Sequence, residues 1–170
     1  MLSKSLNWPA AIHESAHAAA ALALGGTVYG LRLRPPGGGS CRIKFSPATE
    51  PKTLAFYQMI TAYAGGVGER LLLDKDTPDD CDDLIAAIGR SKQFAPGDPK
   101  AQRAARRLAR QRTEEILKPL CPQIAAVATM LVRASEIDPQ RLLESSLPAA
   151  ALAVRAKIAA AAQRRSTADE

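Results

Sequence analysis

The feature that most constrains this chain is a pair of histidines, His13 and His17, on a run that is otherwise nearly all apolar. The run follows Pro9, which suits a first helical turn, and stops at Gly25 and Gly26, where a left-handed helix cap is expected. Polar groups buried on such a helix lose hydration, so they need partners within the fold. A shared metal ion would be one such partner.

Residues 13–17 read His-Glu-Ser-Ala-His, which is the His-Glu-x-x-His arrangement. On a helix, the two histidines lie one turn apart on the same face and can bind one metal ion. Neutral imidazole suits Zn²⁺, and a catalytic zinc site leaves one position for water, beside which Glu14 would act as general base. Because the chain has only two histidines and both belong to this motif, we favour a zinc site over two buried core residues.

The motif does not supply the third ligand. A catalytic zinc usually has three protein ligands, but the chain has no third histidine, and no glutamate follows His17 within the next turns. The remaining ligand is therefore a distant carboxylate or a rarer ligand type. Six aspartates lie between residues 74 and 83, and capping and the helix dipole at the start of the next helix explain most of them.

Hydrophobic periodicity predicts a mainly helical α+β fold. Aromatic residues make up only 4% of the chain and alanine is frequent, which suits closely packed helices more than a barrel or a sandwich. Residues 27–34 and 41–45 have strand character and flank a Pro-Pro-Gly-Gly-Gly break, so we expect a small sheet of two or three strands. We expect helices at residues 9–24, 52–73, 84–89, 100–117 and 123–132, then from 139 and from 148 to 165.

The length of 170 residues predicts a single domain over residues 1–170. Within it, we expect a metal-site part with the small sheet at residues 8–94 and a C-terminal helical bundle at residues 100–165. Gly65, Gly66 and Gly68 lower the helix propensity of the 52–73 segment, which predicts that another backbone packs closely there.

The net charge of +6 permits loose attraction to anionic partners. Five arginines follow a helical stripe, namely Arg103, Arg106, Arg107, Arg110 and Arg112. A solvated helix face explains this stripe more simply than a nucleic-acid contact does, so we expect no specific nucleic-acid partner.

The cysteines and the apolar runs bear on the compartment. Cys41, Cys81 and Cys121 are widely spaced and show no Cys-x-x-Cys pairing, so we expect reduced thiols. No N-terminal stretch has the pattern of a signal peptide, and the apolar run at residues 18–24 is too short to span a bilayer. We expect a cytoplasmic protein with no membrane span.

The order of three segments resembles the peptidase domain of the FtsH-type ATP-dependent zinc metalloproteases. The segments are residues 13–18 (His-Glu-Ser-Ala-His-Ala), 64–70 (Ala-Gly-Gly-Val-Gly-Glu-Arg) and 81–84 (Cys-Asp-Asp-Leu). In that family, the metal motif is followed by a strand pair, by an Ala-Gly-Arg-x-Ala-Glu-Glu helix and by a Ser-Asn-Asp-Leu segment whose Asp is a zinc ligand. The resemblance covers most of residues 8–146. Ala16 stands where the family usually has Gly, and Gly66 where it usually has Arg.

The resemblance implies a zincin-like metallopeptidase domain in which Asp83 is the third zinc ligand, with Glu50 and Asp79 as weaker candidates. The implied function is a zinc-dependent metalloendopeptidase that hydrolyses peptide bonds in unfolded or flexible polypeptides. Family members carry an ATPase ring, but this chain has no Gly-x-x-x-x-Gly-Lys-Ser/Thr loop, so a separate ATPase or a homo-oligomer would be the partner. The alternative is a metal-stabilised interaction or regulatory protein without catalysis.

Overall fold

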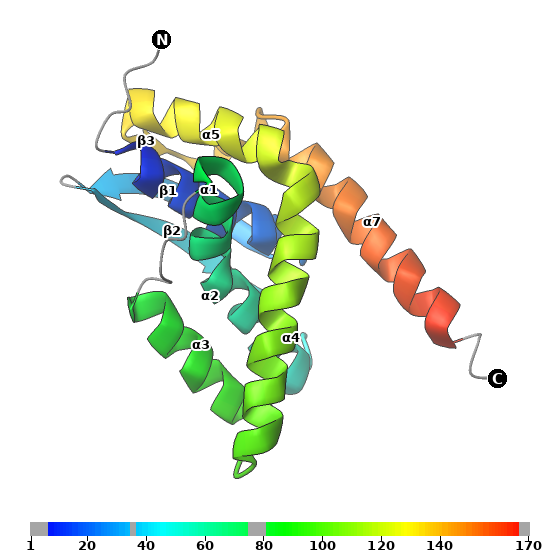
Figure 1. Cartoon of the computed structure of the whole chain (residues 1–170). Helices are drawn as coiled ribbons and strands as arrows, with labels where there is room; N and C mark the ends of the chain where they lie inside the picture. Colours follow the sequence, from blue (N-terminus) through cyan, green and yellow to red (C-terminus); the bar gives the residue numbers. More distant parts are fainter. Residues whose placement is uncertain (1–6, 35–36, 75–80, 167–170) are drawn as a thin grey trace.

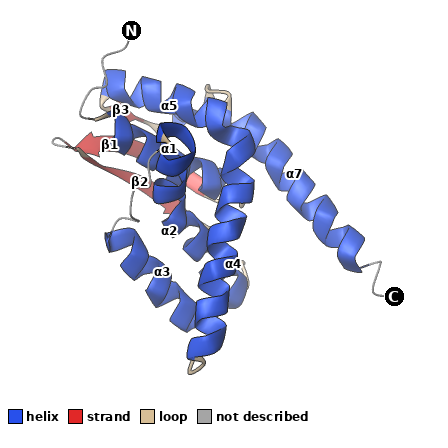
Figure 2. Ribbon diagram, in the orientation of Figure 1, coloured by secondary structure: helices blue, strands red, loops and turns tan. Residues whose placement is uncertain are grey.

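A computed structural model describes residues 7–34, 37–74 and 81–166. The fold is mainly helical with one three-stranded antiparallel sheet, which confirms the α+β prediction (Figure 2). In chain order the elements are α1 (Trp8–Ala23), β1 (Thr27–Arg34), β2 (Gly38–Lys44), α2 (Pro51–Leu73), α3 (Cys81–Phe94), α4 (Pro99–Leu117), the 3-10 turn η1 (Lys118–Leu120), α5 (Cys121–Ala134), β3 (Glu136–Ile137), α6 (Pro139–Leu143) and α7 (Leu147–Ser166).

Helix α1 is the centre of the molecule, and α2, α5, α7 and the sheet pack around it (Figure 1). Its alanines are almost completely buried, and their small side chains let neighbouring elements come close. A Cβ added at Gly68 of α2 would lie only 2.4 Å from the Cβ of Ala16. The close backbone approach predicted for the α2 glycines is therefore present, and it fixes α2 directly against the face of α1 that carries the histidines.

The sheet has the strand order β2-β1-β3, so β2 is an edge strand among the described elements. Strand β2 begins at Gly38, earlier than the expected start at Cys41. Only glycine fits at position 39 of this strand, because a Cβ there would lie 2.5 Å from the Cγ atom of Glu14. The Gly-rich run was expected to separate two strands. Its last two glycines instead belong to β2, and they allow this strand to pass close to α1.

The later helices build on the first two. Helices α3 and α4 pack against α2, whereas α5 and the first half of α7 pack against α1. Buried residues from α1 to α7 form one core cluster, so residues 8–94 and 100–165 share it. Helix α7 then extends away from the body of the protein (Figure 1).

The helical stretch Pro99–Ala134 contains a segment apolar enough to cross a membrane by length and composition alone, and 39% of that segment is buried. Within this stretch α4 ends at Leu117, as expected, and Pro119 and Pro122 follow it. Each occupies one of the first two positions of η1 or α5, where the missing backbone N–H is not needed.

Candidate metal centre

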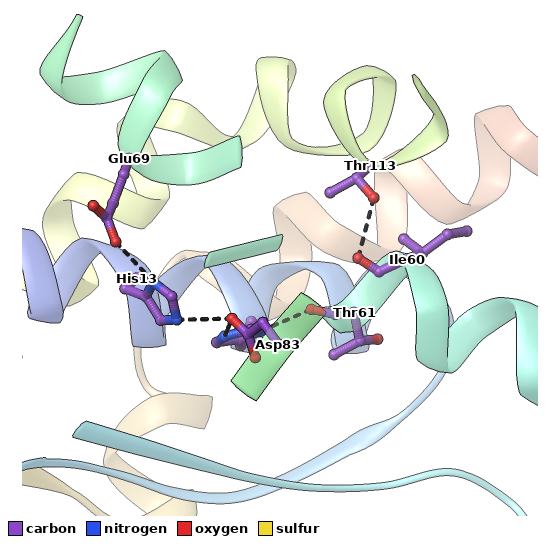
Figure 3. A network of polar contacts seen from close by, with 7 residues as sticks. His13, Ile60, Thr61, Glu69, Asp83 and Thr113 are labelled. Carbon is purple, nitrogen blue, oxygen red and sulfur yellow. Dashed lines mark hydrogen bonds and ion pairs between the residues drawn. The ribbon is translucent and has the colours of Figure 1, made fainter. Parts of the chain in front are cut away.

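Two helices bring the predicted metal ligands together. His13 and His17 lie on α1, and Asp83 lies in the first turn of α3. Figure 3 shows His13 and Asp83 facing each other. The Oδ2 atom of Asp83 lies 3.0 Å from Nε2 of His13 and 3.2 Å from Nε2 of His17. Residues 66 to 70 positions apart in the sequence therefore meet at one point, which lies between α1 and the start of α3.

The second nitrogen of each imidazole is already engaged. His17 Nδ1 donates to the backbone carbonyl of Thr61, and the two atoms are 2.7 Å apart. His13 Nδ1 lies 2.7 Å from Oε1 of Glu69 and donates to that carboxylate. Because a backbone carbonyl and an ionised carboxylate can only accept a hydrogen bond, each Nδ1 carries the proton, and in a neutral imidazole the Nε2 atom then presents a lone pair.

The donor set fits zinc. Two imidazole nitrogens and one carboxylate oxygen converge, and these atoms all lie within 4.8 Å of one another. Zinc–ligand bonds of about 2.0–2.1 Å in a tetrahedral site place the ligand atoms roughly 3.3 Å from one another. The distances from Oδ2 of Asp83 to the two Nε2 atoms are close to this value. The Oδ2 atom of Asp83 is buried and has no hydrogen bond, although it lies within ion-pair distance of both rings. A buried carboxylate oxygen that lies against two imidazole nitrogens needs a proton or a cation between them.

The electrostatics of the cluster favour positive charge. Burial alone would lower the pKa of His13, but the neighbouring carboxylates of Asp83 and Glu69 outweigh it and raise the pKa to about 10. Burial would raise the pKa of Asp83, but the two histidines hold it well below its usual range. The carboxylate is therefore ionised, as a metal ligand must be.

Glu14 lies beside the candidate metal ligands without belonging to their cluster. Its side chain is 7% exposed and rests against the backbone of Gly39 on β2. Both histidines, Glu14, Asp83 and most of β2 line one cleft of about 990 Å³. A carboxylate in a cleft with two imidazoles is placed to exchange protons with a molecule bound there.

The weaker ligand candidates do not join the cluster. The exposed Glu50 caps α2 instead, because its side chain accepts hydrogen bonds from the backbone N–H groups of Lys52 and Thr53. Asp79 lies outside the described residues. The thiol of Cys41 lines the cleft, but burial and the nearby charge of Glu14 raise its pKa, so the thiolate that binds metals is disfavoured.

Two supporting groups were not singled out from the sequence, namely Glu69 and the carbonyl of Thr61. Both belong to α2, at spacings of four residues on either side of Gly65. A Cβ at Gly65 would lie 2.3 Å from Nε2 of His13, so this glycine makes room for the imidazole. The signal available in the sequence was this spacing, because positions 61, 65 and 69 share one helix face.

A search against models of protein families and a search against curated proteins both find no match for this sequence. Function is therefore inferred from the chemistry of the site itself.

Proposed function

We propose that this protein is a zinc-dependent metalloendopeptidase with a zincin-like fold, in which His13, His17 and Asp83 hold Zn²⁺ and Glu14 is the general base. One observation carries the proposal: the two Nε2 atoms lie 3.0 and 3.2 Å from a buried carboxylate oxygen that has no hydrogen bond, while each Nδ1 already donates a hydrogen bond elsewhere. Hydrogen bonds of this kind, donated by Nδ1, are typical of histidines that bind a metal.

The chemistry can be assigned to residues of this chain. Bound zinc supplies a Lewis acid that polarises a peptide carbonyl and makes water acidic near neutral pH. Glu14 accepts the proton that the attacking water loses, and the same carboxyl can return it to the leaving amine. A purely structural metal site would have no need of a buried carboxylate beside it, so the position of Glu14 favours an enzyme.

The cleft suggests an extended substrate. The free edge of β2 runs along one wall, and a polypeptide could pair with its backbone N–H and C=O groups by strand addition. Only unfolded or flexible segments have backbone N–H and C=O groups that are free to pair in this way. A separate ATPase or a homo-oligomer would be required to process folded proteins, as in the FtsH-type enzymes that the sequence resembles.

The departure at Ala16 from the FtsH-type pattern is consistent with this proposal. Its Cβ packs onto Gly68, which has no side chain, so a methyl group on α1 is accommodated by a glycine on α2. The two helices can then approach closely with the Ala–Gly pair in place of the Gly that the family usually has on the motif helix. We propose that residues 1–170 form one peptidase domain of this type.

Substitution of Glu14 by Gln tests the function. Glutamine keeps the size of the side chain but accepts no proton, so hydrolysis of a fluorescently labelled unfolded protein should fall at least 100-fold while zinc content stays unchanged. Glu136→Gln is a matched control, because it removes an exposed carboxylate on β3, away from the cleft.

Two outcomes would overturn the proposal. Full activity in Glu14→Gln would show that this carboxylate is not the base. Stoichiometric zinc with no turnover of any unfolded substrate by the wild type would indicate the alternative, a metal-stabilised protein without catalysis.

A further inference from the structure

Strand β2 follows the cleft along its length. Residues 37–41 and 43–45 line it, and Glu14 packs against Gly39 on the same strand. Seven residues of strand span roughly 23 Å, which is enough to contact several consecutive residues of an extended polypeptide. This inference rests on the proposed function. If a substrate polypeptide binds along β2, the side chains of β2 determine which polypeptides can bind in the cleft.

The two faces of β2 differ in chemistry. Its pairing with β1 places Gly39, Cys41 and Ile43 opposite the buried residues Leu33, Leu31 and Val28, so these positions face the interior. Arg42 and Lys44 alternate with them and are exposed on the outer face. Because side chains of adjacent strands share a face, an added strand would place every second side chain beside these two cations.

The outer face of the sheet is positively charged. Arg32 and Arg34 of β1 are exposed on the same side as Arg42 and Lys44. Glu136 of β3 forms an ion pair with Arg32, with 2.8 Å between the nearest atoms. Among the described residues, no carboxylate forms an ion pair with Arg42 or Lys44, and Arg42 donates only to the backbone carbonyl of Tyr29 at 3.3 Å.

The inner side of the same groove is less polar. Cys41 and Ile43 pack against the core, and Leu54, Ala62 and Ala86 line the cleft from α2 and α3. Side chains that an added strand directs inward beside Cys41 and Ile43 would meet these apolar groups, where a charged residue would lose hydration.

We propose that the substrates of this cleft are extended polypeptides with acidic side chains at two positions separated by one residue, which lie beside Arg42 and Lys44. The residue between them is small or apolar and faces the cleft. Charge complementarity favours this occupant, because opposite charges on neighbouring strands attract while like charges repel. Strand β2 and the proposed metal ligands line the same cleft, so a polypeptide that binds to β2 would lie beside the site that cuts it.

A scanned peptide library tests this proposal. A single Asp or Lys is moved through a neutral unstructured peptide, and kcat/KM is measured for the zinc-loaded wild type. Binding of the same labelled peptides to Glu14→Gln is measured by fluorescence anisotropy. Asp should be preferred over Lys roughly tenfold at two positions that are two residues apart, with no such preference at the position between them.

Charge reversal on β2 is the decisive comparison. Arg42→Glu and Lys44→Glu should each reverse the preference at one of the two positions, so that Lys is favoured there. Arg107→Glu changes the net charge equally, but it lies on α4 outside this cleft, and it should leave both preferences unchanged.

The outcomes separate this proposal from the proposed function. Cleavage with no alternating preference, or an equal effect of Arg107→Glu, would overturn the substrate assignment and leave the peptidase intact. Acid-selective binding to Glu14→Gln without cleavage by the wild type would support the binding surface and overturn the enzyme. Displacement of bound peptide by single-stranded DNA at physiological salt would mark the face as a nucleic-acid surface and overturn the substrate assignment.

Discussion

Gly65 of α2 is the position at which a single methyl group should disable the proposed metal centre. A Cβ added there would lie 2.3 Å from both Cε1 and Nε2 of His13, whereas ordinary van der Waals contact begins at 3.4 Å. The imidazole would have to retreat by about 1 Å, and zinc–ligand distances tolerate only about 0.2 Å. Gly65→Ala should therefore remove His13 as a ligand without changing it.

The expected magnitude is large for the metal and small for the fold. A lost ligand should weaken zinc binding at least about 100-fold, because even the loss of an outer hydrogen-bond partner costs 10- to 100-fold. This corresponds to about 2.7 kcal/mol of binding free energy. Alanine also favours a helix over glycine by roughly 1 kcal/mol, which offsets part of the strain, so the metal-free variant should remain folded.

Gly89→Ala is the matched control for this prediction. Gly89 lies on α3, and a Cβ there would meet no atom within 4 Å. Zinc affinity is measured by competition with a chromophoric chelator, and folding is measured by circular dichroism. Gly89→Ala should bind zinc like the wild type, and wild-type affinity in Gly65→Ala would refute the placement of His13 against α2.

Four further predictions concern the groups around the proposed ligands. Glu69→Ala should weaken zinc binding about 10- to 100-fold, because His13 loses the acceptor of its Nδ1 hydrogen bond. Glu69→Gln keeps an acceptor oxygen, so its loss of zinc affinity should be smaller. Equal zinc affinity in the wild type and both variants, measured by chelator competition, would contradict this role of Glu69. Gly39→Ala should reduce peptide hydrolysis more than zinc content, because its Cβ would displace the Glu14 side chain, and unchanged turnover would argue against this contact. Zinc affinity should rise about tenfold per pH unit between pH 7 and 9, because the raised pKa of His13, about 10, means that the metal must displace one proton throughout this range. In the metal-free protein, the same shift contributes stability that is fully present below pH 6.5 and is lost as the pH rises towards about 10. Calorimetry in buffers of different ionisation enthalpy should show the release of about one proton at pH 8, and no release would contradict the linkage.

The sequence was sufficient for the elements with strong local signals. The apolar run around His13 predicted α1, and the alternation from Thr27 to Arg34 predicted β1. A helix was also expected from residue 139, where the structure shows α6 capped by the side chain of Asp138. Each of these signals depends on residues within one or two turns of one another, so no long-range information was needed.

The remaining features depend on distant contacts. Strand β3 has only two residues, Glu136 and Ile137, which is too short for a visible alternation, and it forms because β1 offers an open edge to pair with. Glu69 near the end of an apolar helix could have been a surface carboxylate until the packing of α2 on α1 placed it beside His13. The choice of Asp83 among its acidic neighbours likewise follows from the entry of α3 towards the histidines, which spacing alone does not fix.

The most direct test of the central claim is the zinc content of the purified protein, without chelators or a histidine tag, for the wild type and for Asp83→Asn and Asp82→Asn. The two variants remove one carboxylate each from neighbouring positions, but only Asp83 lies against both imidazoles. The proposal predicts about one zinc per chain in the wild type and in Asp82→Asn, and strongly reduced zinc in Asp83→Asn. A wild type that holds no zinc and takes up none on addition, or an Asp83→Asn variant that binds zinc normally, would contradict it.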